Sequence, residues 1–450
     1  MSRIPKDVQH LFADFSKEFS SSVWERFLHL LIASIVLRGR KTVWRLLYCS
    51  GIKTVGHFSS YHRIFSHRRW SSWALSRRLC SAIIHRLVPD GVLQLVGDDT
   101  VSQHRGVNVY GKGCHRDAVR SSHNHLVRRW GHKWVVLALR VQVPGAKRTW
   151  ALPVLVALYH TPNESKRLGI RHKTPPELMQ GLLSVWLRWF PHRKSVFSGD
   201  GGFATHRLSQ FASRYSRQLC LVSKLVPTAV LHEAPSPRKQ NQMGRPRVVG
   251  KRLPSPQEVV AKRSRGRQLN VGWYGGGTRR VRVIAGVGHW YRQGQGLVKI
   301  RWVYVQDLDG SHRDEYFYST DTQMTATEII EAFVGRWDIE VTFEEMREHL
   351  GLETTRGRSR NTVLRVEPCQ FLLYSLIVYW FVQLSSQKEA AVVWYSWPGK
   401  SSITFSDAMI AVRRSAWEKY IFQQPQLRGQ VEKLSGTTKK RILDALALAT

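Results

Sequence analysis

The sequence predicts a mixed α/β fold with helical regions at both ends and a β-rich insert in its second half. Three observations predict it. Short apolar runs typical of buried strands alternate with helical patterns between residues 91 and 224, and the patterns before and after are helical. A segment rich in Pro, Arg and Lys then precedes two further strand-like runs. With 450 residues, the chain is long enough for two or three domains.

Residues 1–90 are predicted to be helical. Helical patterns cover Val23–Val36, Thr42–Tyr48 and Ser59–Phe65, and seven basic residues lie between and after them: Arg38, Arg40, Lys41, Arg68, Arg69, Arg77 and Arg78. Short helices separated by basic clusters are compatible with a helix-turn-helix DNA-binding unit. A plain helical scaffold explains the pattern equally well.

Residues 91–224 supply the first part of an α/β core. In chain order the predicted elements are the strands Val92–Val96, Trp134–Val141 and Trp150–Leu158, the helix Pro175–Phe190, the strand Ser195–Ser198, the helix Thr205–Tyr215 and the strand Gln218–Val222. The first helix begins with proline, whose missing N–H is not needed at a helix start.

A basic, β-rich insert is predicted over residues 225–320. Its first part, to about residue 268, reads as a flexible loop rich in Pro, Arg and Lys. Val281–Gly286 and Leu297–Gln306 then alternate in the manner of strands.

The chain returns to the core at residues 321–365, where a helix is predicted from Ala326 to His349. Residues 366–450 are predicted to form a helical C-terminal region, a candidate for dimerisation. Its apolar run Phe371–Leu384 is too short to cross a bilayer and reads as a buried core helix, so we expect no membrane partner.

The composition indicates a polyanionic partner. Lys and Arg number 69 against 32 Asp and Glu, a formal net charge of +37. A hydrophobic content of 42% with 17 Trp indicates a folded protein and excludes a basic disordered tail. Five cysteines without a CxxC pair argue against a disulfide framework, and the N-terminus has no secretory pattern, so we expect a cytoplasmic protein.

Cysteine and histidine gather in one basic stretch of the predicted core. Its members are Cys114, His115, His123, His125 and His132. Their spacing matches no zinc-finger pattern, so we interpret them as histidines of a basic loop rather than as ligands.

Acidic residues lie where strands and a helix could bring them together. Asp98 and Asp99 follow the first predicted strand, Asp200 follows the fourth, and Glu340 lies on the late helix. Such carboxylates can hold two divalent cations for phosphoryl transfer, and Mg²⁺ prefers oxygen ligands. Acids in a protein of charge +37 make sense beside DNA if metal ions invert their local charge. Taken singly, each Asp is more often a turn or cap residue.

One predicted helix combines this glutamate with arginines. At about 100° per residue, Arg336, Glu340 and Arg347 share one face, and Phe333 lies on the same side. Arginine can clamp phosphate oxygens beside a metal-bound carboxylate. A surface helix carrying i,i+4 ion pairs is the alternative. Trp337, and Trp273 or Trp290 in the insert, could stack on a base flipped out of DNA, although core packing is the commoner role.

These motifs together resemble the DDE transposases of bacterial insertion sequences. The resemblance rests on Asp98-x-Thr100, on Asp200 in Ser-Gly-Asp-Gly-Gly-Phe after a strand, and on Arg336-x3-Glu340-x6-Arg347. It is closest to the group with the signature Tyr-x2-Arg-x3-Glu-x6-Lys, and it covers about residues 92 to 350.

The resemblance implies an RNase H-like catalytic core that cuts and joins DNA with two Mg²⁺ ions, for which Mn²⁺ can substitute. It implies Asp98, Asp200 and Glu340 as catalytic metal ligands. Asp99 is the alternative first ligand, although the spacing from Asp to Thr favours Asp98. Arg336, Arg347, Phe333 and Trp337 would contact DNA. Phe333 stands where the group has Tyr, so the tyrosine hydroxyl is missing. Arg347 stands where the group has Lys, so a planar guanidinium replaces an ammonium group.

The function that follows is transposition. Such an enzyme would bind the terminal inverted repeats of its element, cut the element ends and join the 3′-hydroxyls to target DNA. The resemblance implies a homodimer that brings two ends together in a synaptic complex, in the bacterial cytoplasm on the nucleoid. The alternatives are a non-catalytic DNA-binding protein derived from a transposase, and a metal-dependent nuclease without strand transfer.

Overall fold

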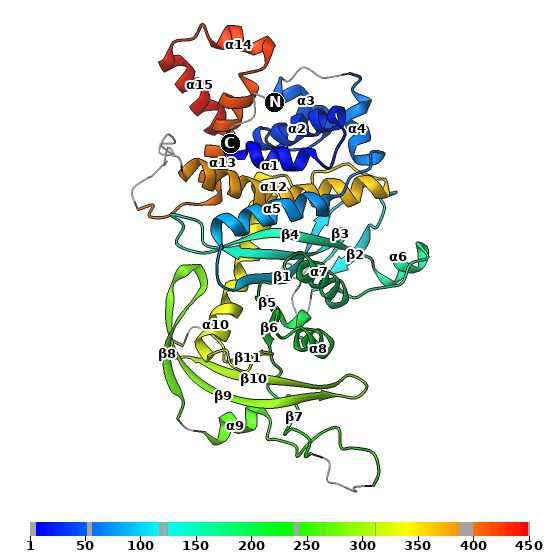
Figure 1. Cartoon of the computed structure of the whole chain (residues 1–450), viewed down its shortest axis with the longest axis vertical. Coiled ribbons are helices and arrows are strands. Elements are labelled where there is room, and N and C mark those ends of the chain that lie inside the picture. Colours follow the sequence, from blue (N-terminus) through cyan, green and yellow to red (C-terminus); the bar gives the residue numbers. More distant parts are fainter. Residues whose placement is uncertain are drawn as a thin grey trace.

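The chain folds into an elongated molecule with helices at one end and a large sheet through the rest (Figure 1). The computed structural model describes residues 6–51, 56–116, 121, 125–237, 243–263, 265–310, 312–386 and 399–448. Parts of two predicted segments, the basic loop after residue 225 and the C-terminal region, and His123 therefore lie outside the described residues.

The N-terminal part is helical, as predicted. The helices are α1 (Lys6–Ser16), α2 (Ser21–Val36), α3 (Val43–Ser50), α4 (Ser59–Ser66) and α5 (Ser72–Leu87). The hydroxyls of Thr42 and Ser71 accept hydrogen bonds from backbone N–H groups in the first turns of α3 and α5 and so define where these helices begin. The sequence patterns had not singled out α1 and α5.

Five strands form the central part of the sheet in the order β4-β3-β1-β5-β6. They are β1 (Leu93–Gln103), β3 (Arg128–Val141), β4 (Trp150–Tyr159), β5 (Ser195–Gly199) and β6 (Leu219–Lys224). β1 pairs antiparallel with β3, and β3 with β4, whereas β1, β5 and β6 are parallel. Three antiparallel strands followed by two parallel strands in this order are the RNase H-like arrangement, so the predicted fold class is confirmed. A short strand, β2 (Gly113–Arg116), extends β3 at its outer end.

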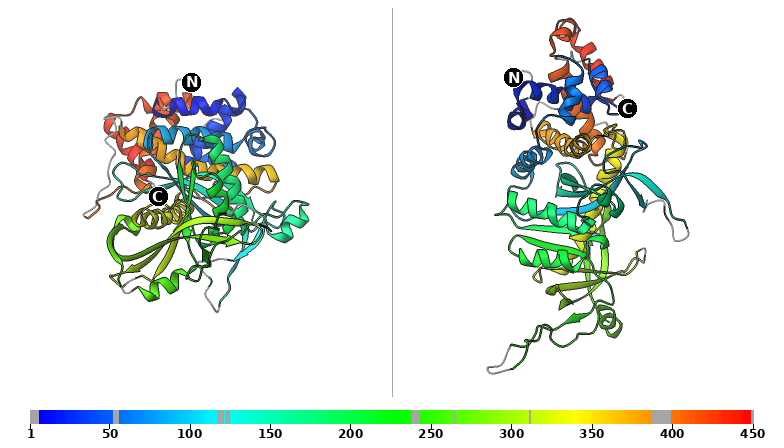
Figure 2. Two further views of the ribbon diagram at one scale, coloured as in Figure 1. Left: turned by 60° about the horizontal axis from the view of Figure 1, so that its bottom comes forward. Right: turned by 90° about the vertical axis from the view of Figure 1, so that its right-hand side faces the viewer.

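Helices connect these strands and cover the sheet. α6 (Pro162–Arg167) and α7 (Pro175–Trp189) join β4 to β5, and α8 (His206–Arg214) joins β5 to β6. α7 begins with a capping box between Thr174 and Glu177. Figure 2 (right) shows these green helices on one side of the strands and the yellow helices that follow the insert on the other.

The predicted insert is β-rich, but it continues the core sheet instead of forming a separate layer. Its elements are β7 (Leu231–His232), α9 (Pro256–Lys262), β8 (Arg267–Gly272), β9 (Thr278–Arg292), β10 (Gly296–Asp307) and β11 (Glu315–Ser319). β11 pairs antiparallel with β6, and the order continues β11-β10-β9-β7, with β8 beside β9, to give one 11-stranded sheet over the described residues. The edge of β6 that would otherwise be exposed is thereby covered.

The late helix is divided by one tight turn. α10 (Ala326–Val334) and α11 (Asp338–His349) are separated by the 3₁₀ turn η3 (Gly335–Trp337), whereas the sequence predicted one continuous helix. Backbone angles stay helical through the turn, so the axis continues. A Cβ at Gly335 would come within 2.0 Å of Arg140 Nη1, so a larger residue there would displace the guanidinium that pairs with Asp338.

The C-terminal region is helical where it is described. α12 (Arg360–Ser386) is followed by α13 (Phe405–Ala416), the π-helical turn η4 (Trp417–Ile421), α14 (Pro425–Val431) and α15 (Gly436–Leu448). α12 is long and apolar enough to cross a membrane by length and composition, yet 83% of its apolar window is buried within the protein. It is therefore a core helix, as predicted for its apolar run.

One apolar core joins the two ends of the chain. Side chains of α1, α2, α4 and α5 pack with those of α12, α13 and β4 in a single buried cluster. Figure 1 shows α5 and α12 lying between the sheet and the outer helices. The described residues of the N-terminal helices therefore share their core with the C-terminal helices, and their DNA-binding role stays a prediction.

Candidate active site

The first two acidic residues lie inside β1, not after it as predicted. β3 pairs with β1 from Gln94 to Gln103, with Asp98 opposite Val136 and Asp99 opposite Val135. Successive side chains of a strand point to opposite faces of the sheet. Asp98 accordingly meets Arg336, whereas Asp99 forms an ion pair with Lys133 at 2.9 Å. The two neighbouring carboxylates are therefore directed to different partners.

Asp200 lies beside Asp98 because β1 and β5 are parallel. Gly97 is paired with Gly199, which brings the next residues of the two strands to adjacent positions. The Asp200 carboxylate accepts a hydrogen bond from the N–H of Gly202 at 2.9 Å and caps the turn that follows. The Ser223 hydroxyl donates to the carbonyl oxygens of Gly199 and Asp200, 2.8 Å each, which holds this strand end in place.

Arg336 joins the strand acid to the helix acid. Its Nη1 donates to Asp98 Oδ2 at 2.8 Å and to Glu340 Oε1 at 2.9 Å, and its side chain is 11% exposed. Further along the helix, Arg347 Nη2 donates to the Thr100 hydroxyl at 2.6 Å. Arg336, Glu340 and Arg347 thus share the side of the helix that faces β1, as the sequence periodicity predicted.

Burial makes the two neighbouring aspartates of β1 harder to ionise. Burial raises the pKa of Asp98 to about 7, with Arg336 opposing the rise and Asp200 adding to it. Burial also raises the pKa of Asp99, and Lys133 opposes that rise. A buried carboxylate with a raised pKa beside a second carboxylate is typical of a functional site that binds cations.

Phe333 does not reach the surface, which corrects the prediction that it contacts DNA. Its side chain is 2% exposed and its ring stacks on Phe317 with centroids 4.4 Å apart. The Arg336 guanidinium lies 5.7 Å from the ring centroid, so Phe333 supports this arginine from the core.

Trp337 is the exposed aromatic residue of the motif. It is 46% exposed and lies edge-on to Tyr274 of the insert with centroids 5.9 Å apart. Trp273 lies edge-on to the same tyrosine, whereas Trp290 packs against His206 and Tyr318 in the core.

A polar network fixes the start of α11 against β3 and β4. Asp338, which is 8% exposed, accepts from Arg140 Nε at 3.1 Å and from the Thr149 hydroxyl, and lies 3.7 Å from Arg148 Nη1. Arg148 also pairs with Glu345 at 3.2 Å, and the Tyr374 hydroxyl donates to the same glutamate at 2.6 Å. The network sets the position of α11, and hence of Glu340, relative to the sheet.

Asp338→Ala is expected to destabilise the fold by about 3 kcal/mol, because it leaves the half-buried Arg140 without its carboxylate and removes one of the two carboxylates beside Arg148. Chemical denaturation measures the change. Asp338→Asn is the control, since it keeps an acceptor for Thr149 and removes only the charge, and it should cost less. Equal stability of Asp338→Ala and the wild-type chain would contradict the role given to the network.

The sequence left several members of this site unassigned. Lys133, which pairs with Asp99, and Asp338, which lies within the helix motif, show no distinctive spacing. Thr100 was part of the first motif, but its bond from Arg347 was not predicted. Tyr274 follows Trp273 in the insert and could have been found only by asking which aromatic residues approach Trp337.

The donor set suits a hard divalent cation. Asp98, Asp200 and Glu340 offer only carboxylate oxygens, which Mg²⁺, Ca²⁺ and Mn²⁺ prefer, and they provide neither imidazole nor thiolate. Acids from β1, from the end of β5 and from a late helix, on a sheet of this topology, define the RNase H-like class of nucleases.

Within this class the chain belongs to the DDE superfamily endonucleases, whose family model matches residues 14–280. A second model, of the archaeal transposase family ISC1217, matches residues 293–379, which include Glu340. The predicted resemblance to DDE transposases is thus confirmed at the level of the superfamily, while the bacterial group with the Tyr-x2-Arg-x3-Glu-x6-Lys signature stays a prediction.

Among solved structures, the chain is similar to a piggyBac transposase synaptic complex with hairpin DNA, determined by cryo-electron microscopy. The identity is 11% and the TM-score 0.41, over 98% of this chain and 81% of that chain. No curated protein matches the chain.

Proposed function

We propose that the chain is the transposase of a bacterial insertion sequence. It binds the terminal inverted repeats of its element as double-stranded DNA, cuts at the element ends and joins the 3′-hydroxyls to target DNA. The observation that carries this proposal is the cluster in which Arg336 joins Asp98 to Glu340, with Asp200 at the adjacent strand end, in a DDE-superfamily chain of charge +37.

Asp98, Asp200 and Glu340 are proposed to hold two Mg²⁺ ions, for which Mn²⁺ can substitute. When bound, such ions lower the pKa of an attacking water or 3′-hydroxyl and neutralise the leaving oxygen. The Arg336 bond to both Asp98 and Glu340 supports Asp98 as the first ligand, because Asp99 is committed to Lys133 on the other face.

Arg336 and Arg347 are proposed to contact DNA phosphates near the cut, and Trp337 to stack on a base. The exposed face of Trp337 beside Tyr274 supports the stacking role. Arg336 is bound to two acids before DNA arrives. Metal ions would compete for these acids, and the freed guanidinium could then bind a phosphate.

DNA binding away from the site is proposed to use the N-terminal helices. Of the basic residues predicted there, Arg78 pairs with Glu18 and Lys41 is buried, donating to the carbonyl of Ser34. Arg38 is half-buried and donates to the carbonyl of Leu448. The other four are exposed: Arg40, Arg68, Arg69 and Arg77. The proposed assembly is a homodimer in a synaptic complex, acting in the cytoplasm on the nucleoid.

A cleavage and joining assay tests this function. The DNA on both sides of the reading frame should carry short inverted repeats, and the full chain should cut a fragment that contains one repeat. Joining of pre-cut ends to a plasmid separates a transposase from a nuclease without strand transfer. Binding of the repeats without cutting would instead favour the non-catalytic alternative.

Arg336→Ala and Arg347→Ala are expected to lower the single-turnover cleavage rate about tenfold to a hundredfold, because each charge-assisted contact is worth roughly 1.5–3 kcal/mol. Equilibrium affinity for the same DNA should change little, since many basic residues share the phosphate contacts.

Arg428→Ala is the matched control for this loss of charge, because Arg428 is exposed and pairs only locally with Glu432. Its single-turnover cleavage rate and its affinity for the DNA should equal those of the wild-type chain. If the two helix variants cut normally and lose only affinity, the helix is an outer binding surface and its proposed place in the chemistry is wrong.

A further inference from the structure

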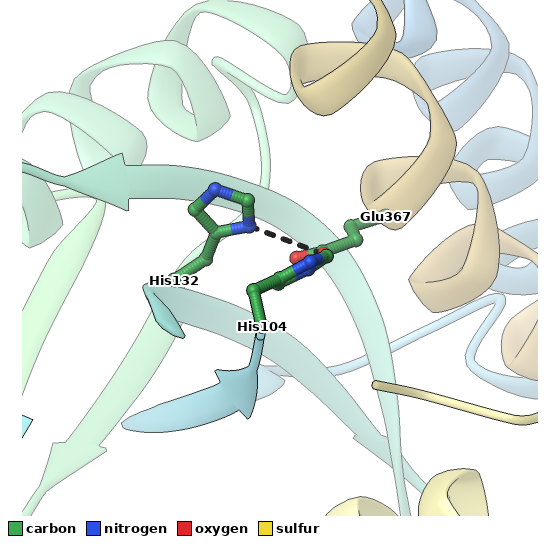
Figure 3. A group of neighbouring side chains, drawn as sticks. All are labelled: His104, His132 and Glu367. Atoms are coloured by element: carbon green, nitrogen blue, oxygen red, sulfur yellow. Dashed lines mark hydrogen bonds and ion pairs between the residues drawn. The ribbon is translucent and has the colours of Figure 1, made fainter. Parts of the chain in front are cut away.

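A second group of possible metal ligands lies apart from the acidic site. His104 follows β1, His132 lies in β3 and Glu367 lies in α12, and their side chains point toward one another (Figure 3). They are 6%, 0% and 1% exposed, and their ligand atoms all lie within 4.8 Å of one another. Six residues of extended strand separate His104 from Asp98, a distance of about 20 Å.

The hydrogen bonds of His132 restrict where its protons can be. Nε2 lies 2.9 Å from the carbonyl oxygen of Tyr110, which can only accept, so Nε2 carries a proton. Nδ1 lies 3.2 Å from Glu367 Oε1, another acceptor when the carboxyl group is ionised. Either Nδ1 carries a second proton, or its lone pair is directed at a cation that the carboxylate shares.

The Glu367 carboxylate is oriented for such sharing. Its Oε2 accepts from the Ser102 hydroxyl at 2.8 Å and from Trp134 Nε1, which leaves Oε1 directed at both imidazoles. His104 Nε2 lies 2.5 Å from Glu367 Oε1, and the Thr355 hydroxyl donates to the same Oε1 at 3.2 Å. Three donors other than the histidines therefore hold the Glu367 carboxylate in this orientation, with Oε1 facing both imidazoles.

We propose that His104, His132 and Glu367 bind one Zn²⁺ ion. Two imidazoles and a carboxylate are ligands that Zn²⁺ prefers, and the fourth position would take a water. The bond from His132 to the Tyr110 carbonyl, and those from Ser102 and Trp134 to Glu367, are the outer contacts that orient zinc ligands. Ligand atoms around a tetrahedral zinc lie about 3.4 Å apart, so Oε1 must move back from His104 by about 1 Å.

The group adjoins a cavity at His104. His104 and Tyr110 line a cavity of about 920 Å³ together with Lys112, Arg128 and Trp130. The ion would join three elements that are far apart in the sequence, namely the end of the strand that carries Asp98, β3 and α12. Its role would be structural, because it would fix α12 and the preceding α11 relative to β1.

Metal analysis of the purified full-length chain tests the proposal. After dialysis we expect about one zinc ion per chain. Glu367→Gln keeps an acceptor for Trp134 and removes the charge, and His104→Gln removes one ligand, so both should retain less than about a tenth of the zinc. His115→Gln is the matched control, since His115 is a buried neighbour on β2 outside the group, and it should keep the metal.

Two further measurements distinguish loss of the zinc site from misfolding of the variants, and from metal bound at the acidic site. The wild-type chain stripped by a chelator should take up one Co²⁺ with the visible absorption of a tetrahedral nitrogen and oxygen site, and its Tm should rise on reloading. Asp200→Asn should retain the zinc. The proposal is wrong if the wild-type chain contains no zinc and takes up neither Zn²⁺ nor Co²⁺ after stripping. His132 would then carry a proton on each ring nitrogen.

Discussion

Asp200→Asn is expected to lose at least about a thousandfold in DNA cleavage rate, or about 4 kcal/mol of transition-state stabilisation, while it binds terminal DNA as the wild-type chain does. Asparagine can still cap the turn at Gly202, so the strand end should keep its shape and lose only the charge that holds a cation. Asp98→Ala and Glu340→Ala should be equally inactive. Single-turnover cleavage beside equilibrium binding on the same DNA measures both quantities.

Asp321→Asn is the matched control, because Asp321 also caps a turn after a strand of the same sheet and pairs with Lys194 away from the cluster. It should cut normally. Wild-type cleavage by Asp200→Asn would remove this residue from the active site. An inactive Asp99→Ala together with an active Asp98→Ala would make Asp99 the first ligand.

The acidic cluster could be predicted from the sequence because its members lie at places with local signals. Asp200 follows a short apolar strand and precedes two glycines, and Glu340 lies four residues after Arg336 on a helix. The apolar run before Asp98 ends at Gly97, so the strand was predicted to end there as well. β1 continues because β3 supplies hydrogen-bond partners up to Gln103, a contact between distant segments that no local pattern shows.

Contacts between distant segments also explain the other differences between the predicted and the observed structure. Strands β9 to β11 looked like a separate insert, since nothing in their sequence shows that β11 pairs with β6. The helical repeat places Phe333 on the same side as Arg336, yet its ring is covered by Phe317 of β11. His104 and Glu367 are separated by more than half of the chain, so their meeting with His132 follows only from the fold.

Glycine at position 335 shows how the helix motif depends on tertiary packing. Sequence periodicity alone predicted a smooth helix through this position. The guanidinium of Arg140 leaves little room for a larger side chain at this position, and Arg140 also pairs with Asp338 at the start of α11. The helical repeat then places Arg336 and Glu340 on the side that faces β1.

Cleavage is expected to require Mg²⁺ or Mn²⁺, to fail with Ca²⁺ and to stop completely in excess EDTA. Three carboxylates near one guanidinium have oxygens for hard cations, and Ca²⁺ with its looser coordination holds the reacting oxygens poorly. Burial raises the pKa of Asp98 to about 7, so protons compete with metal ions for this ligand below that pH.

Competition between protons and Mg²⁺ for Asp98 should weaken Mg²⁺ binding at low pH. A cation binds the ionised carboxylate, so the Mg²⁺ concentration that gives half-maximal cleavage should rise as the pH falls below 7, by up to about tenfold per pH unit for one proton. Above pH 8 it should become constant. Cleavage rates at several Mg²⁺ concentrations between pH 5.5 and 8.5 measure this, with DNA binding in EDTA as the control for folding. Full cleavage in excess EDTA would exclude metal-dependent chemistry, and a half-maximal concentration independent of pH would mean that Asp98 is not a ligand.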